Sequence, residues 1–120
     1  MKFGCEDLDV YKIAREYVTK IYRITKVFPS TEQYGVTSQI NRAAVSIVLN
    51  IAEGSAKESK KEFKKYLRNA IASLIETDTA LKVSIDLGYV YQKDYDALSP
   101  VIKELYFKMI GLTKYLSRQQ

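Results

Sequence analysis

The chain of 120 residues carries 19 basic and 14 acidic side chains, giving a net charge of +5, and it contains one cysteine and no histidine. A chain of this length forms one domain with a core of its own. The single cysteine excludes a disulfide framework, and the lack of histidine removes the commonest general base and metal ligand together. The lack of histidine is strong evidence against zinc sites, histidine-dependent triads and di-iron bundles, and we expect no metal and no cofactor.

The N-terminal segment MKFGCEDLDV contains three acidic residues and no apolar stretch, so it does not resemble a secretory signal. The longest run without a charge lies at residues 43–52. A membrane-spanning helix needs about 20 apolar residues, which is far longer. We therefore expect a cytoplasmic protein.

Four amphipathic segments follow one another, and their apolar residues recur at alternating steps of three and four. This period is typical of helices that pack side by side in a left-handed bundle. The rows are Val10, Ala14, Tyr17, Ile21, Ile24 and Phe28; Val36, Ile40, Ala43, Ile47 and Ile51; Phe63, Leu67, Ala70, Leu74, Thr77, Leu81 and Ile85; and Leu98, Ile102, Leu105, Met109, Leu112 and Leu116. We predict an all-α, antiparallel up-down-up-down four-helix bundle, one domain over residues 1–120 with an ordered core over about 7–117.

Proline and glycine mark the expected helix ends. Pro29 ends the first helix, because the residue before a proline is pushed out of the α region. Gly54 and Gly88 take the position after the second and third helices. Pro100 leaves two alternatives: it starts the fourth helix, or that helix begins near Gln92 and is kinked at the proline.

The second helix carries a polar row on a mostly apolar element. The row shares one helical face and comprises Gln39, Arg42, Ser46, Asn50 and Glu53. A helix that is apolar nearly all round is usually buried on most sides. In so small a protein, this pattern indicates contacts with partner subunits as well as with the chain's own bundle.

Buried polar side chains need partners, and the third helix offers a matching row of Asn69, Ser73 and Glu76. We predict a hydrogen-bond network between helices or between subunits, with Arg42 and Glu76 as one candidate pair. The alternative is a catalytic carboxylate pair of Glu53 and Glu76. Without a histidine, a nucleophile or a glycine-rich loop that pair is a weak constellation, so we expect no catalytic residue and no enzyme.

A run of cations is expected to occupy the first turns of the third helix, and we call it the basic rim: Lys57, Lys60, Lys61, Lys64, Lys65 and Arg68. The helix dipole disfavours cations at this end of a helix. One interpretation is a solvated face neutralised by Glu58–Lys61 and Glu62–Lys65 pairs. The other is a surface that binds phosphates of nucleic acid without reading bases.

A specific block, QIxRAAxSIxxNIAEG at residues 39–54, carries a family resemblance, together with Phe28-Pro29, Tyr34-Gly35, Glu76-Thr77 and Leu87-Gly88-Tyr89. The chain resembles the proteins encoded by intervening sequences of bacterial 23S rRNA genes. It is related more remotely to the accessory variability determinant of diversity-generating retroelements. The resemblance implies a four-helix bundle that assembles into a ring, expected to be a pentamer, with no established enzymatic activity. The retroelement relative works by binding a reverse transcriptase and nucleic acid.

Two functional hypotheses follow. The first is a non-enzymatic, homo-oligomeric accessory protein that binds RNA electrostatically through the basic rim. The alternative is a protein–protein adaptor whose ring docks another protein, such as a polymerase-like partner, without binding RNA itself. The sequence does not identify the RNA or the partner protein.

Overall fold

The computed structural model describes residues 1–119, and within them every regular element is helical. The long helices are α1 (Asp9–Thr25), α2 (Val36–Ser55), α3 (Lys60–Asp86) and α4 (Gln92–Arg118). Two short 3-10 helices, η1 (Gly4–Asp7) and η2 (Ser30–Glu32), precede α1 and α2. The prediction of an all-α fold with four helices is confirmed.

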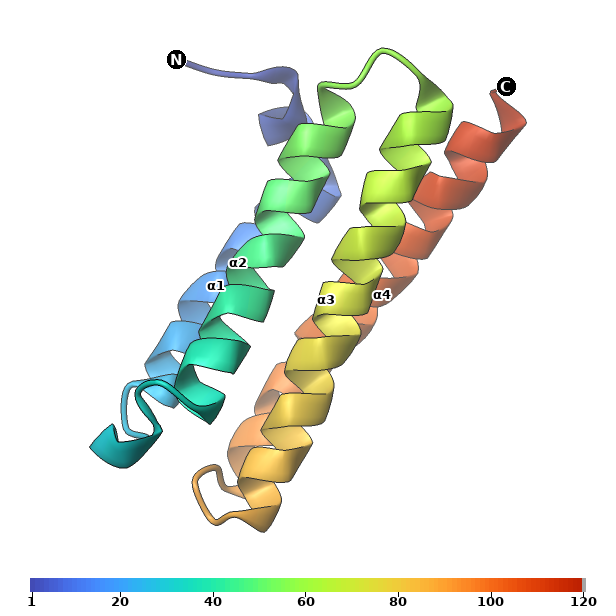
Figure 1. The fold of residues 1–120 in the computed structure, drawn as a ribbon. Coiled ribbons are helices and arrows are strands. Elements are labelled where there is room, and N and C mark those ends of the chain that lie inside the picture. Colours follow the sequence, from blue (N-terminus) through green and yellow to red (C-terminus); the bar gives the residue numbers. More distant parts are fainter. Residues whose placement is uncertain (120) are drawn as a thin grey trace.

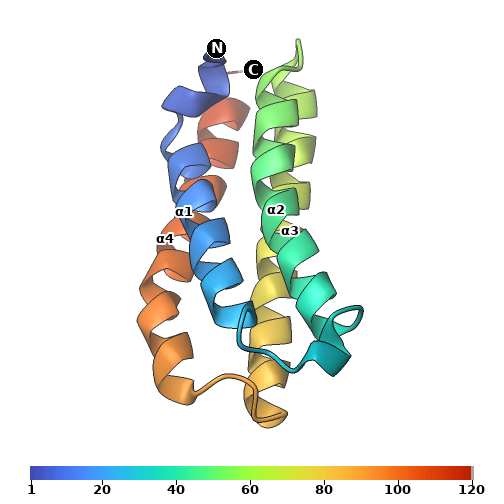
Figure 2. The same ribbon diagram turned by 90° about the vertical axis from the view of Figure 1, so that its left-hand side faces the viewer.

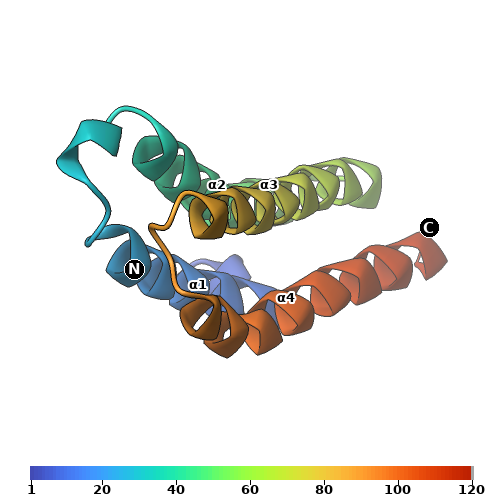
Figure 3. The same cartoon turned by 90° about the horizontal axis from the view of Figure 1, so that it is seen from below.

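The four helices lie in two layers, with α2 and α3 packed on α1 and α4 (Figure 3). Each helix contacts two neighbours, and the α2–α3 contact is the most extensive. Both termini and the α2–α3 connection lie at one end of the elongated molecule, which we call the terminal end (Figures 1 and 2). The α1–α2 and α3–α4 connections lie at the opposite end, the far end.

One hydrophobic core runs between the layers, and it is built from the four predicted apolar rows. Most row members are buried, and the rest, such as Ile24, Phe63 and Leu112, are partly buried against the same core. None of the helices within residues 1–119 has an apolar stretch long enough to cross a bilayer. The spacing of apolar residues therefore identified the buried face of every helix.

One polar pair lies inside this core. The hydroxyls of Tyr17 on α1 and Thr77 on α3 are 2.7 Å apart, and both residues are fully buried. Thr77 also donates to the carbonyl of Leu74, at 2.7 Å. Because Thr77 directs its hydroxyl hydrogen to Leu74, the Tyr17 hydroxyl donates to Thr77. Burial raises the pKa of Tyr17 well above its ordinary value.

The first helix ends earlier than Pro29 predicts. α1 stops at Thr25, whose hydroxyl donates to Oδ1 of Asn41 on α2, at 2.8 Å. The chain then turns so that Phe28 packs into the core against Tyr89, with ring centroids 5.5 Å apart. Phe28 is therefore buried as expected, but from the connection and not from the helix.

The prediction that Gly54 follows the second helix is wrong, because α2 continues through Ser55. A Cβ at Gly54 would lie 2.6 Å from Cβ of Tyr66 and 3.0 Å from Cδ1 of Phe63. The glycine is thus needed for the close approach of α2 and α3, and it does not act as a helix stop.

The structure also defines the end of α3 and the start of α4. Gly88 has a φ of 80°, and the amides of Gly88 and Tyr89 bond to the carbonyls of Ile85 and Ser84 in a Schellman motif, as predicted. α4 begins at Gln92, so Pro100 lies inside the helix. The alternative in which Pro100 starts α4 is wrong.

The Tyr17–Thr77 pair generates a stability prediction. Thr77→Val leaves the buried Tyr17 hydroxyl without its partner, so we expect a loss of about 1–3 kcal/mol in the free energy of unfolding. Tyr17→Phe should cost less, because Thr77 still donates to Leu74. Urea denaturation at fixed protein concentration measures both, and equal costs for the two variants would contradict the assignment.

A second prediction concerns the helix contact at Gly54. Gly54→Ala places a rigid Cβ against Tyr66, so we expect an overpacking cost of about 1–3 kcal/mol that outweighs the better helix propensity of alanine. Gly111 is the matched control, because an added Cβ there meets no atom within 4 Å. Thermal unfolding should show a lower Tm for Gly54→Ala and a higher Tm for Gly111→Ala. A Gly54→Ala protein as stable as its parent would show that the helices can separate at no cost.

Candidate nucleic-acid interface

The basic rim lies at the terminal end of the molecule, where the chain passes from α2 to α3 (Figure 1). Ser59 caps α3 by accepting a hydrogen bond from the amide of Glu62, at 3.1 Å. Lys57 precedes this cap, so the expectation that it belongs to the third helix is wrong. Its ammonium lies over the ring of Tyr66, 5.3 Å from the centroid.

Two of the rim cations are directed toward α4. Nζ of Lys60 donates to the carbonyl of Gln119 at 3.1 Å, and Nζ of Lys64 donates to Oγ of Ser117 at 3.3 Å. The C-terminal end of a helix carries unpaired carbonyls and partial negative charge, which favour cations. The end of α4 therefore offsets the unfavourable position of these lysines at the start of α3.

The remaining rim residues on α3 face away from the bundle. Lys61, Lys65 and Arg68 are exposed. Ion pairs within residues 1–119 do not include the Glu58–Lys61 or Glu62–Lys65 pairs that would neutralise this surface. These three cations are thus available to a polyanion in solution.

The fold brings two further cations, from α4, next to the basic rim. Lys114 and Arg118 are exposed on the last turns of α4, beside the start of α3 (Figures 1 and 2). Residues 63–75 and 105–118 contain no acidic side chain. The sequence does not reveal that these α4 cations lie near the basic rim, because about 50 residues separate the two segments in the chain.

The polar rows of α2 and α3 meet only in part. Ser46 and Ser73 approach each other with their hydroxyl oxygens 3.0 Å apart, and Nδ2 of Asn50 donates to the hydroxyl and carbonyl of Ser46, at 3.0 and 2.8 Å. The other members are exposed: Gln39, Arg42, Glu53, Asn69 and Glu76. Ion pairs among the described residues do not include Arg42–Glu76.

The same contact separates the two candidate catalytic carboxylates. Ser46 and Ser73 fix the register of α2 on α3. Glu53 then lies about 10 Å from Ser46 toward the terminal end, and Glu76 lies about 4.5 Å from Ser73 toward the far end, at 1.5 Å per residue. Within one chain, the two side chains cannot act on the same substrate atom. Residues 1–119 also contain no group of three or more acidic or cysteine side chains that could hold a metal.

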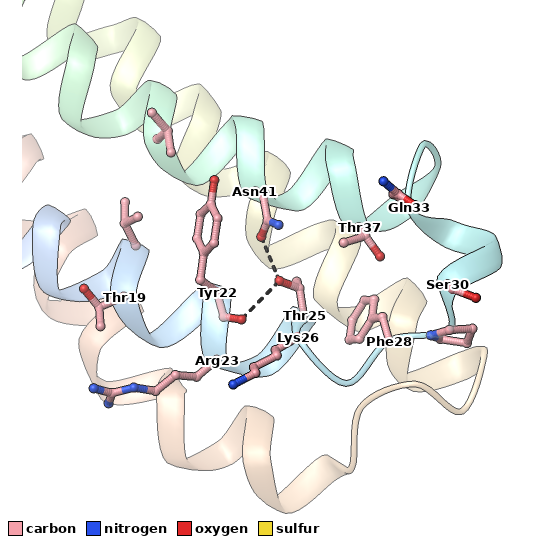
Figure 4. A pocket seen from close by; sticks show the side chains of 13 residues that line it. Thr19, Tyr22, Arg23, Thr25, Lys26, Phe28, Ser30, Gln33, Thr37 and Asn41 are labelled. Atoms are coloured by element: carbon pink, nitrogen blue, oxygen red, sulfur yellow. Dashed lines mark hydrogen bonds between the residues drawn. The ribbon is translucent and has the colours of Figure 1, made fainter.

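A second surface feature lies at the far end, between the end of α1 and the start of α2 (Figure 4). It is an open groove of about 910 Å³, lined by Val18, Tyr22, Phe28 and Val45 among others. Thr25 and Asn41, which are joined by a hydrogen bond, both line it (Figure 4). Arg23 and Lys26 also line the groove. No pattern in the sequence predicted this groove.

Comparison with known proteins places these features in a family. A family model described as 23S rRNA-intervening sequence protein matches residues 6–111. A crystal structure of a protein with unknown function from the S23 ribosomal protein family of Bacteroides thetaiotaomicron VPI-5482 is similar, with 26% identity and a TM-score of 0.78. The match covers 88% of this chain and 98% of that one. No curated protein matches the chain. Because the family model spans most of the sequence, the chain belongs to the family of 23S rRNA-intervening sequence proteins.

Proposed function

We propose that this protein is a non-enzymatic, homo-oligomeric accessory protein of the cytoplasm that binds RNA electrostatically through the basic rim. The observation that carries the proposal is the outward direction of Lys61, Lys65 and Arg68, with no ion pair to the neighbouring glutamates among the described residues. Cations in this arrangement neutralise phosphates and release condensed counterions. They do not read base edges, so binding is largely indifferent to sequence.

A ring of subunits would strengthen RNA binding, because the basic rim of one subunit alone binds RNA weakly. In an antiparallel bundle repeated around a ring, here proposed to be a pentamer, each subunit contributes the same cations to one polyanion. Avidity then multiplies weak individual contacts. Oligomerisation also gives α2 a partner, since Leu49 is 52% exposed on that helix and most of the polar row is exposed beside it.

The protein–protein adaptor is the second candidate, and the groove at the far end favours it. An open, mostly apolar groove of about 910 Å³ suits a protein segment better than it suits a polyphosphate chain. Under this alternative, a polymerase-like partner docks on the ring and bare RNA does not bind. The two candidates use opposite ends of the molecule, so they can be tested separately.

Charge reversal tests the RNA-binding proposal. We expect Lys61→Glu with Lys65→Glu to weaken binding of a labelled structured rRNA fragment by roughly 10- to 100-fold at about 50 mM salt, because two phosphate contacts per subunit become repulsive. Fluorescence anisotropy at about 50 and 200 mM salt gives the affinity and its salt dependence. The matched control is Lys26→Glu with Lys93→Glu, which changes the net charge equally but lies at the far end, after α1 and at the start of α4.

Lys60 and Lys64 are left intact in this design, because both contact the end of α4. Circular dichroism should be unchanged in both double variants. Unaltered RNA affinity in the Lys61/Lys65 variant would overturn the proposal that the basic rim binds RNA. A folded, oligomeric wild-type protein that binds no RNA at 50 mM salt would favour the adaptor.

The oligomer is tested through α2. Leu49→Asp places a charge in the proposed subunit contact, so we expect the assembly to dissociate, with a fall in mass measured by light scattering. Tyr34→Asp is the control, because Tyr34 is 91% exposed and lies outside α2. An assembly that survives Leu49→Asp would exclude this face of α2 from the subunit contact.

A further inference from the structure

We infer that the outer face of α4, formed by Phe107, Gly111, Lys114 and Arg118, holds a single-stranded stretch of the nucleic acid whose phosphates the basic rim binds. The inference rests on the proposed function and adds to it the class of nucleic acid and a second helix of the interface. It is carried by three features of α4: its charge, an exposed aromatic ring and an unexplained glycine.

The four residues share one helical face, on the half of α4 that leads to the terminal end. They recur at steps of four, three and four, so their side chains point in one direction from the helix. All four are exposed. The bonds from Lys60 to Gln119 and from Lys64 to Ser117 hold the last turns of α4 against the start of α3. The cations of both helices therefore lie on one surface with few acidic groups.

Phe107 is the one of these four residues that is suited to a base and not to a phosphate. Phe107 is 66% exposed, although its side chain has no polar atom that could form a hydrogen bond with water. Tyr106 meets its ring edge to face, with centroids 5.3 Å apart and an interplanar angle of 83°, which restricts its orientation. An exposed aromatic ring among cations is the usual platform on which an unpaired base stacks. A duplex keeps its bases stacked on one another and would leave this ring unused.

Gly111 lies one turn from Phe107, in the interior of α4, and the folded chain does not require it. An added Cβ would meet no atom within 4 Å, and its φ is not positive, since Gly88 is the glycine with positive φ. Glycine inside a helix lowers helix stability relative to alanine. A residue that breaks a local rule with no gain inside the fold indicates an external use. Here glycine leaves the helix backbone open to close approach by a flat ligand next to the ring.

The test compares one single-stranded RNA oligonucleotide with the duplex formed by the same sequence and its complement, at about 50 mM salt. For Phe107→Ala, we expect single-strand affinity to fall roughly 5- to 150-fold, while duplex affinity changes less than about twofold. Gly111→Ala should raise the Tm and yet weaken single-strand binding. Tyr91→Ala is the control, because Tyr91 is 74% exposed but lies at the far end, and it should change neither affinity.

The possible failures are distinguishable. If the wild-type protein binds neither form of RNA, the proposed function fails and this inference fails with it. If Lys61→Glu with Lys65→Glu weakens binding but Phe107→Ala leaves single-strand affinity unchanged, the basic rim stands and the role of α4 is overturned. The remaining case is that this face of α4 is a subunit contact. Light scattering tests it, because loss of the oligomer in Phe107→Ala or Gly111→Ala would overturn the inference.

Discussion

The close packing of α2 on α3 is the constraint on which the rest of the structure depends. Gly54 allows the two helices to approach so closely that an added methyl group would lie 2.6 Å from Tyr66. The hydroxyls of Ser46 and Ser73 meet further along the same contact and fix its register. This register places the basic start of α3 at the terminal end, and it separates Glu53 from Glu76. One helix contact thus positions the proposed interface and keeps the two carboxylates of one chain apart.

Electrostatic compensation between helices explains why the start of α3 tolerates its cations. The helix dipole opposes Lys60 and Lys64 at that position, but the C-terminal end of α4 lies beside them and accepts hydrogen bonds from both. These two lysines therefore contribute to the fold as well as to the charge of the surface. Lys61, Lys65 and Arg68 have no such contact with α4, and for this reason we assign the binding of phosphates mainly to them.

The polar and apolar surfaces lie at opposite ends of the molecule. Cations gather at the terminal end, whereas the open groove between α1 and α2 lies at the far end (Figures 2 and 4). The surfaces of the two proposed functions therefore do not overlap. In the proposed ring of subunits both surfaces would be repeated.

The sequence by itself determined the helices and their buried faces, because the spacing of residues such as Leu67, Leu74 and Leu81 is a local property of the chain. It also identified the cations of α3 and excluded histidine chemistry. Only the tertiary structure decided that Gly54 serves helix packing, that Lys60 and Lys64 contact α4, and that Lys114 and Arg118 join the basic surface. These features depend on the register between segments far apart in the chain, and periodicity along one helix carries no information about that register.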